Sequence, residues 1–263
     1  KGHEDRSVYI YSDKGAWHGY SLPPDDDQAN AGSFIGPYLM TQDNGIWLSE
    51  SFSQIKIERG GKTIFPGKHE TINNVSFPHQ LLREYEIKNP HLSIKTDLIL
   101  VSGRTSLIRV SIQNLSQTDQ RITINFSGET FPGIAQLEKA ENGILIDFDD
   151  HTNIGFLKSG GLMHETHTSG ETGYRTEFAN VEIPKSSSID FYQTQTFCFN
   201  QSELDKETVL IDQVLQNPDQ YFSENLRIWN SKIQKVVDQL NPIYTADADQ
   251  RVAVKCLQTL NNN

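Results

Sequence analysis

The sequence contains few cysteines. Only two are present among 263 residues, Cys198 and Cys256. This number excludes a disulfide-stapled scaffold and a cysteine metal cluster. Cys198 ends a strand-like run and Cys256 falls on a helical face, so we expect two single, buried thiols.

Positive charge is also scarce. The chain carries 23 Lys and Arg against 34 Asp and Glu, a formal net charge of −11. Nucleic acids and anionic membranes are bound through basic surfaces, so neither is an expected partner. No apolar run approaches the roughly 20 residues of a membrane-spanning helix, so no membrane span is expected.

The sequence lacks the short motifs of common catalytic and nucleotide-binding sites. It contains no G-x-S-x-G, no Walker A loop and no dinucleotide-binding fingerprint. Glycosidic hydrolysis needs two carboxylates that face each other across a sugar, and no pair stands out among the many Asp and Glu. We therefore assign no catalytic residue to this chain and expect no cofactor.

A long β pattern runs from Gln54 to Phe199. Residues 91–101 and 104–113 alternate apolar and polar positions around Ser102-Gly103, which predicts an antiparallel hairpin with one buried face. Residues 59–62 form a second hairpin turn signal. Further strands are expected at 54–58, 121–126, 143–148, 153–158, 173–183 and 188–197. Many short strands separated by turns predict a mainly β fold, a large antiparallel β-sandwich.

The period changes to that of helices after Phe199. Residues 203–215 have apolar positions at mixed helical spacing, and residues 218–240 carry a clear amphipathic stripe with Pro218 in the first turn. A third helix is expected from about Ala246, and its apolar stripe continues to the last residues of the sequence. Because an apolar helix face normally has a partner, we expect the chain to be a fragment of a longer protein that continues into a helical domain.

Aromatic residues gather between glycines near the N-terminus, in the segments 15–20 (GAWHGY) and 32–40 (GSFIGPYLM). Glycines at this density let the backbone turn tightly. Aromatic rings with polar edges suit the binding of sugar rings. The alternative is that these rings fill the core beneath a β-sheet, as most aromatic side chains do. The candidate substrate-binding residues are Trp17, His18, Tyr20 and Tyr38.

Two groups of residues have a superficial likeness to metal ligands. His164 and His167 are three positions apart, but loop-like glycines flank them and no third ligand is evident, so a solvated loop or an edge-strand pair is expected. Asp147, Asp149 and Asp150 lack the spacing of a calcium loop, so a strand end with exposed carboxylates is expected. No metal site is predicted.

The string GAWHGYSLP at 15–23, followed by GSFIGPY at 32–38, resembles the N-terminal region of bacterial glycoside hydrolase family 63-type enzymes, which include α-glucosidases and mannosylglycerate hydrolases. Residues 104–110 (RTSLIRV) resemble a strand of the same region. Residues 253–263 (AVKCLQTLNNN) are similar to the first helix of the domain that follows it. The resemblance spans most of the chain in order.

This resemblance implies a β-supersandwich N-domain over 1–199, a helical linker over 200–244 and the first helix of an (α/α) barrel over 245–263. In such enzymes the barrel carries the general acid and general base for inverting hydrolysis of α-glucosides, which places both carboxylates beyond Asn263. The chain is then expected to be a non-catalytic domain that braces the barrel and shapes one side of the sugar pocket. Its expected partners are that C-terminal (α/α) barrel and an α-glucoside-like oligosaccharide.

The resemblance also implies that the N-domain sends a loop toward the mouth of the barrel pocket. By position, segment 15–20 is the candidate for this loop. Trp17 is then expected to act as a stacking platform for the sugar, and His18 as a hydrogen-bonding group.

Two other functions remain open. A stand-alone carbohydrate-binding sandwich would need an exposed aromatic platform, whereas a sugar epimerase or lyase would need histidines and carboxylates that converge on the concave face of one sheet. His69, His79 and His91 are too scattered in the sequence to decide this. The chain starts at Lys1 rather than Met, which fits removal of a signal peptide, and a periplasmic or secreted location is expected.

Overall fold

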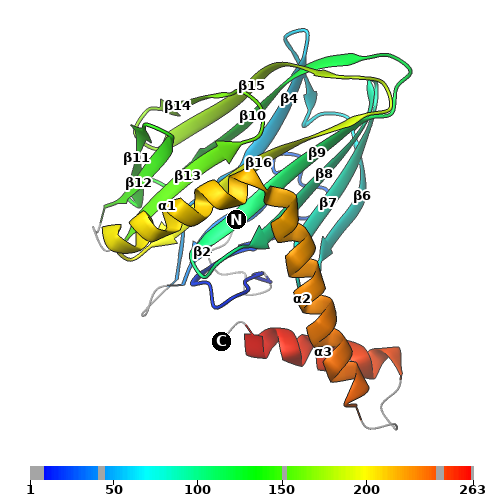
Figure 1. Cartoon of the computed structure of the whole chain (residues 1–263). Helices are drawn as coiled ribbons and strands as arrows, with labels where there is room; N and C mark the ends of the chain where they lie inside the picture. The colour runs from blue at the N-terminus through cyan, green and yellow to red at the C-terminus, as the bar shows by residue number, and fades with distance from the viewer. Residues whose placement is uncertain (1–8, 41–44, 150–152, 241–245, 262–263) are drawn as a thin grey trace.

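The computed structural model describes residues 9–40, 45–149, 153–240 and 246–261. Two antiparallel β-sheets pack face to face, and three helices follow at the C-terminal end of the chain (Figure 1). The mainly β, sandwich-like fold predicted from the sequence is confirmed.

The larger sheet has eight strands. In spatial order they are β11 (Ala135–Ala140), β12 (Gly143–Phe148), β13 (Ile154–Gly160), β16 (Ser188–Cys198), β9 (Thr105–Asn114), β8 (His91–Leu100), β7 (Leu81–Lys88) and β6 (Glu70–Ser76). The predicted hairpin lies within it as β8 and β9, where Ile94 pairs with Ile112 and Leu98 with Ile108. Because side chains alternate between faces along a strand, these residues all point to the inner face.

The smaller sheet has five strands. In spatial order they are β14 (Glu165–Ser169), β15 (Gly173–Ile183), β10 (Gln120–Glu129), β4 (Gln54–Arg59) and β5 (Lys62–Phe65). The predicted turn joins β4 to β5, and both Gly60 and Gly61 have positive φ (56° and 75°). Such values favour glycine, which explains the Gly-Gly pair.

The facing sides of the two sheets enclose the main hydrophobic core. Ile57, Ile124 and Phe178 from the smaller sheet and Ile94 and Ile112 from the larger sheet are all fully buried. Burying one such side chain contributes about 1.5–3 kcal/mol to the free energy of folding, so this layer provides most of the stabilisation.

A small sheet near the N-terminus orders the segment that precedes β4. It consists of β1 (His18–Ser21), β2 (Ile35–Leu39) and β3 (Ile46–Trp47), with β2 in the middle. Tyr11 forms a β-bridge to Tyr20 and adds the N-terminal chain to its edge. This sheet carries three of the candidate sugar-binding residues, His18, Tyr20 and Tyr38, and Trp17 directly precedes it.

Helix α1 (Gln201–Gln216) begins where the sandwich ends. Its N-cap is Asn200, whose side-chain oxygen accepts a hydrogen bond from Glu203 N at 3.0 Å. Its buried face packs on the outer side of β13 and β16, which it crosses in Figure 1. The sandwich is therefore covered by a helix on the face opposite the main core.

Helix α2 (Pro218–Asp238) continues away from the sheet, and α3 (Asp247–Asn261) crosses it (Figure 1). Pro218 occupies the first turn of α2, as its sequence predicts. No helix in the described ranges is long and apolar enough to cross a membrane.

The expectation of two buried thiols is wrong for one of them. Cys198 is buried beneath α1, but Cys256 is exposed on α3. Val252 and Leu260, four residues to either side of Cys256, are 64% and 75% exposed. Helical spacing places the three side chains on one face, so this part of the predicted apolar stripe points to solvent.

Candidate functional site

Trp17 is held inside the fold rather than on its surface. Its side chain is 8% exposed, and its indole Nε1–H donates to the Phe197 carbonyl at 3.0 Å. One face of the ring is covered by Phe199, with ring centroids 4.7 Å apart. The Arg104 guanidinium lies over the same Phe199 ring, 4.6 Å from its centroid. Because Trp17 is 8% exposed and Phe199 covers one of its faces, it has no open face for a sugar.

His18 is fully buried in β1. Its ring packs edge-on against Tyr20 and Phe197, and neither ring nitrogen has a hydrogen-bond partner among the described residues. Burial, with a smaller contribution from the Arg104 charge, lowers the pKa of His18 to about 3. The imidazole is therefore neutral at physiological pH and behaves as a core aromatic ring.

Tyr20 belongs to a row of buried polar side chains. Its hydroxyl lies 2.7 Å from Ser106 Oγ and donates to Gln195 Oε1 at 2.9 Å. Gln195 Nε2 in turn donates to Ser53 Oγ, and Tyr174 closes the row through Gln193. Burial raises the pKa of Tyr20 well above its ordinary value. The polar groups of this row form hydrogen bonds with one another, as buried polar groups usually do.

Segment 15–20 is therefore not the exposed loop that the family resemblance implied. The structure places Trp17, His18 and Tyr20 in the interior, which confirms the alternative that these aromatics fill the core. The physical reason is that β1 pairs with β2 on one side and with Tyr11 on the other. The roles of Trp17 as a platform and of His18 as a sugar ligand require open ring faces and edges that this fold does not provide.

Tyr38 differs from the other three candidates because it is only partly buried. It pairs in register with Trp47 on β3, and the two rings lie 4.9 Å apart at an angle of 58°. Gly45 allows this arrangement, because a Cβ there would overlap the Tyr38 hydroxyl. Neither side chain forms a hydrogen bond to any other described residue. We call these two rings the Tyr38–Trp47 surface.

Trp47 was not a candidate from the sequence. Its run 45–49 is readable as an extended piece, but nothing in that run indicates which aromatic it faces. The register of β2 with β3 supplies this information. Met40 directly follows β2 and is 37% exposed, so a second apolar side chain lies two positions after Tyr38 in the sequence. Partly exposed aromatic rings with polar edges are the features that suit sugar rings.

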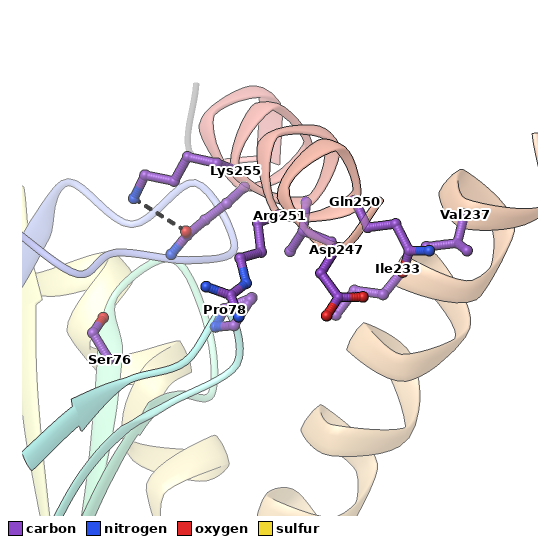
Figure 2. Close-up of a pocket in the computed structure, with 10 residues that line it drawn as sticks. Ser76, Pro78, Ile233, Val237, Asp247, Gln250, Arg251 and Lys255 are labelled. Atoms are coloured by element: carbon purple, nitrogen blue, oxygen red, sulfur yellow. Dashed lines mark hydrogen bonds between the residues drawn. The ribbon is translucent and has the colours of Figure 1, made fainter. Parts of the chain in front are cut away.

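A groove of about 420 Å³ lies between the helical tail and the sandwich (Figure 2). Its lining residues are Ser76, Pro78, Ile233, Val237, Asp247, Gln250, Arg251, Val254, Lys255 and Gln258. Three elements contribute: α3, α2 and the turn between β6 and β7. In Figure 2 Arg251 points from α3 toward Pro78, and Asp247 lies between Arg251 and Ile233. Apart from the spacing of Asp247 and Arg251, which places both on one helix face, no local sequence pattern indicates this groove.

The two histidines with metal-like spacing do not come together with further ligands. His167 pairs with Glu165 at 3.3 Å, whereas His164 packs against Phe178. His167 lies on β14, at the edge of the smaller sheet, and His164 directly precedes this strand, so the expected edge-strand position holds for one of the two histidines. Within the described ranges no group of three His, Cys, Asp or Glu is placed to hold a metal. Asp150 lies outside the described residues.

The three scattered histidines also contact different neighbours. His69 packs against Phe65 and Tyr85, while His79 stacks on Phe77. The third, His91, pairs with Glu86 at 2.7 Å on the surface. The structure does not bring them together in one histidine cluster.

The interior carboxylates are engaged in structural contacts. Asp97 accepts two hydrogen bonds from Arg109, at 3.0 and 3.1 Å, and burial nevertheless raises its pKa. Asp13 accepts from Trp229 Nε1 at 2.8 Å. These are the two buried acidic side chains of the described residues, and they contact different partners. They do not form a facing pair of the kind that glycosidic hydrolysis uses.

Comparison with known proteins gives one family and a shared fold. The family described as the N-terminal domain of glucosidase YgjK matches residues 3–142, more than half of the chain. The Slr1438 protein from Synechocystis sp. PCC 6803 matches with a TM-score of 0.50 and 11% identity, over 76% of this chain and 99% of that chain.

A protein described as a kojibiose phosphorylase from the human microbiome matches with a TM-score of 0.50 and 9% identity. The match covers 96% of this chain, helices included, but this chain spans only 38% of that protein. At such low identities both matches show the fold alone.

Proposed function

The chain belongs to the family of the N-terminal domain of glucosidase YgjK, and on this basis we propose that it is the non-catalytic, carbohydrate-associated domain of a glycoside hydrolase. The observation that carries the proposal is the family match, which runs from the N-terminal segment through β1–β11. The engagement of both buried carboxylates in structural contacts supports a non-catalytic role.

A more specific proposal concerns the domain arrangement and activity of the full-length enzyme. We propose a family 63-type arrangement in which residues 1–199 form the sandwich, 200–244 the helical linker and 245–263 the first helix of an (α/α) barrel. That barrel would perform inverting hydrolysis of an α-glucoside. The exposed apolar stripe of α3, formed by Val252, Cys256 and Leu260, would be covered by the barrel. A periplasmic or secreted location is part of the same proposal.

The attachment of the helices supports the proposed bracing role. Trp229 and Asn225 of α2 form hydrogen bonds to Asp13 and to the His79 carbonyl, so α2 is fixed to two separate parts of the sandwich. Lys255 of α3 lies over the Tyr9 ring, with Nζ 3.6 Å from its centroid. A domain that follows α3 would therefore be held at a defined position relative to the N-terminal segment.

Tyr38 is the predicted sugar-binding residue that a ligand can reach, and it forms the Tyr38–Trp47 surface with a residue that was not predicted. We assign to it the contact with the sugar that the sequence had placed on segment 15–20. Ring stacking against a pyranose and hydrogen bonds from the Tyr38 hydroxyl and the Trp47 indole N–H are the interactions it offers.

The test uses the full-length enzyme that contains this domain. Trp47→Ala and Tyr38→Ala should each raise KM or lower kcat/KM for an α-linked glucose disaccharide by about tenfold, equivalent to about 1.4 kcal/mol of transition-state binding. Tyr9→Ala, which removes an aromatic from the Lys255 contact, is the control for indirect effects on the helices. Unchanged kinetics in both site variants, with unchanged melting temperature, would refute the sugar contact.

A stand-alone carbohydrate-binding module is the second candidate function. The same Tyr38–Trp47 surface favours it, because a binding module needs an aromatic platform that solvent can reach. The chain alone should then bind a soluble glucan with a Kd that Trp47→Ala weakens. An epimerase or lyase has no comparable support, since His69, His79 and His91 contact separate neighbours.

A further inference from the structure

The groove between α2, α3 and the β6–β7 turn has the features of a second ligand site. We propose that this groove binds a short neutral saccharide, independently of the Tyr38–Trp47 surface. The choice of a sugar rests on the proposed carbohydrate-associated function, while the position and chemistry of the site rest on the groove itself. Its volume of about 420 Å³ falls within the range of small-molecule sites, about 300–1,000 Å³.

One wall of the groove is apolar. Ile233 and Val237 line it from α2, Val254 from α3 and Pro78 from the β6–β7 turn. Aliphatic side chains of this kind present C–H groups and no hydrogen-bonding atoms. The C–H face of a pyranose ring can lie against them and release water from both surfaces.

The rim of the groove is polar and carries both signs of charge. Asp247 supplies carboxylate acceptors and Arg251 a planar set of N–H donors, from positions one helical turn apart. Neither side chain has an ion-pair or hydrogen-bond partner among the described residues. Adjacent hydroxyl groups of a sugar can donate to such a carboxylate and accept from such a guanidinium.

The charges also argue for a neutral ligand. Asp247 and Arg251 carry opposite charges. The ammonium of Lys255 keeps its charge but is directed to Gln258 Oε1 at 3.4 Å (Figure 2) and to the Tyr9 ring. The whole chain carries a net charge of −11, which opposes the approach of an anionic ligand. A neutral polyhydroxylated molecule satisfies the apolar wall and the mixed rim without a charge penalty.

One contact beside the groove and one made by its lining residue Lys255 hold the walls in place. Asn225 Nδ2 donates to the His79 carbonyl at 2.6 Å, which fixes the β6–β7 turn against α2. On the opposite side, Lys255 ties α3 to the N-terminal segment through Tyr9. A ligand therefore enters a groove whose geometry is largely set beforehand, which lowers the entropic cost of binding.

The experiment is a calorimetric and ¹H–¹⁵N NMR titration of the 263-residue chain with maltose. We expect millimolar binding, with shifts in amides of α3 and of the turn near Pro78. Arg251→Ala and Asp247→Asn should each weaken binding at least fivefold. Arg227→Ala is the matched control, because Arg227 is an exposed arginine on α2 that pairs with Glu224 and does not line the groove. Circular dichroism checks that α3 remains folded.

The same titration separates this proposal from the proposed function. Binding that Trp47→Ala abolishes and Arg251→Ala leaves intact would overturn the groove and support the Tyr38–Trp47 surface. No binding up to about 50 mM maltose, an affinity weaker than about −2 kcal/mol, would also overturn the groove. Loss of binding in Arg251→Ala would support the groove. Unchanged full-length kinetics in both Trp47→Ala and Tyr38→Ala would, separately, refute the other sugar contact.

Discussion

Trp229 donates its indole Nε1–H to Asp13 Oδ2 at 2.8 Å, and both side chains are buried. Trp229 lies in the middle of α2, and Asp13 lies in the N-terminal segment just before β1. The other carboxylate oxygen of Asp13 accepts from the Lys14 backbone N–H at 2.8 Å. One buried hydrogen bond therefore joins the helical tail to the segment that leads into β1.

Breaking this contact should destabilise the domain. Trp229→Phe keeps most of the ring but removes the donor, and it leaves a buried carboxylate with one fewer partner, so we expect a loss of about 1–3 kcal/mol in the free energy of unfolding. Asp13→Ala should cost a similar amount. A double-mutant cycle by urea unfolding measures their coupling, expected to be at least 1 kcal/mol. Strictly additive losses would show that the two side chains do not interact.

His18 should make the domain sensitive to acid. Its folded-state pKa of about 3 lies below the 6.5 of an unfolded histidine, so the unfolded chain binds the proton first. The contribution of the neutral His18 to the free energy of unfolding is fully present above pH 6.5 and is lost as the pH falls toward 3. The loss is at most about 1.4 kcal/mol per pH unit.

The measurement is the free energy of unfolding from pH 7 to pH 4 for the wild type and for His18→Phe, which keeps an aromatic ring without a titrating group. We expect the variant to have a shallower dependence on pH. His91→Gln is the control, because His91 is a surface residue beside Glu86. Equal slopes in the wild type and His18→Phe would contradict burial of a neutral imidazole.

The absence of a side chain at Gly45 should determine the position of the Tyr38 ring in the Tyr38–Trp47 surface. A methyl group at position 45 would overlap the Tyr38 hydroxyl, so Gly45→Ala should push the Tyr38 ring away from Trp47. We expect the fluorescence of Trp47 and the near-ultraviolet circular dichroism to change. The free energy of unfolding should fall by less than about 1 kcal/mol, because a partly exposed side chain can move. Gly103→Ala is the control, since a Cβ there meets its nearest atom at an ordinary 3.4 Å. An unaltered Tyr38–Trp47 spectrum would show that the ring does not rest on Gly45.

Much of the fold could be predicted from local sequence patterns. The hairpin of β8 and β9, strand β15 and helix α2 have regular periodicity, and their bounds agree closely with expectation. Strand β7 was not predicted although much of it is buried. Strands β6 and β11 were not predicted because polar residues occupy much of each and both lie at sheet edges. In such strands backbone pairing with the neighbour, rather than a buried face, determines the conformation.

The candidate site was harder to predict for a different reason. Sequence composition identified Trp17, His18, Tyr20 and Tyr38 as one aromatic group, but it could not tell interior rings from surface rings. That distinction depends on partners far along the chain, such as Phe199 against Trp17 and Gln195 against Tyr20. The pairing of Tyr38 with Trp47 depends in turn on strand register, which no local pattern reveals.

The distant partners of the N-terminal segment have a consequence for how the protein is made. Trp17 bonds to a residue 180 positions later, Tyr20 to one 175 positions later and Asp13 to one 216 positions later. At a synthesis rate of about 5–20 residues per second, these partners leave the ribosome roughly 10–40 s after the segment that needs them. During that interval the aromatic segment has none of these native contacts. This part of the fold can therefore form only after β16 and α2 have left the ribosome. Until then we expect the exposed aromatic segment of the nascent chain to bind chaperones.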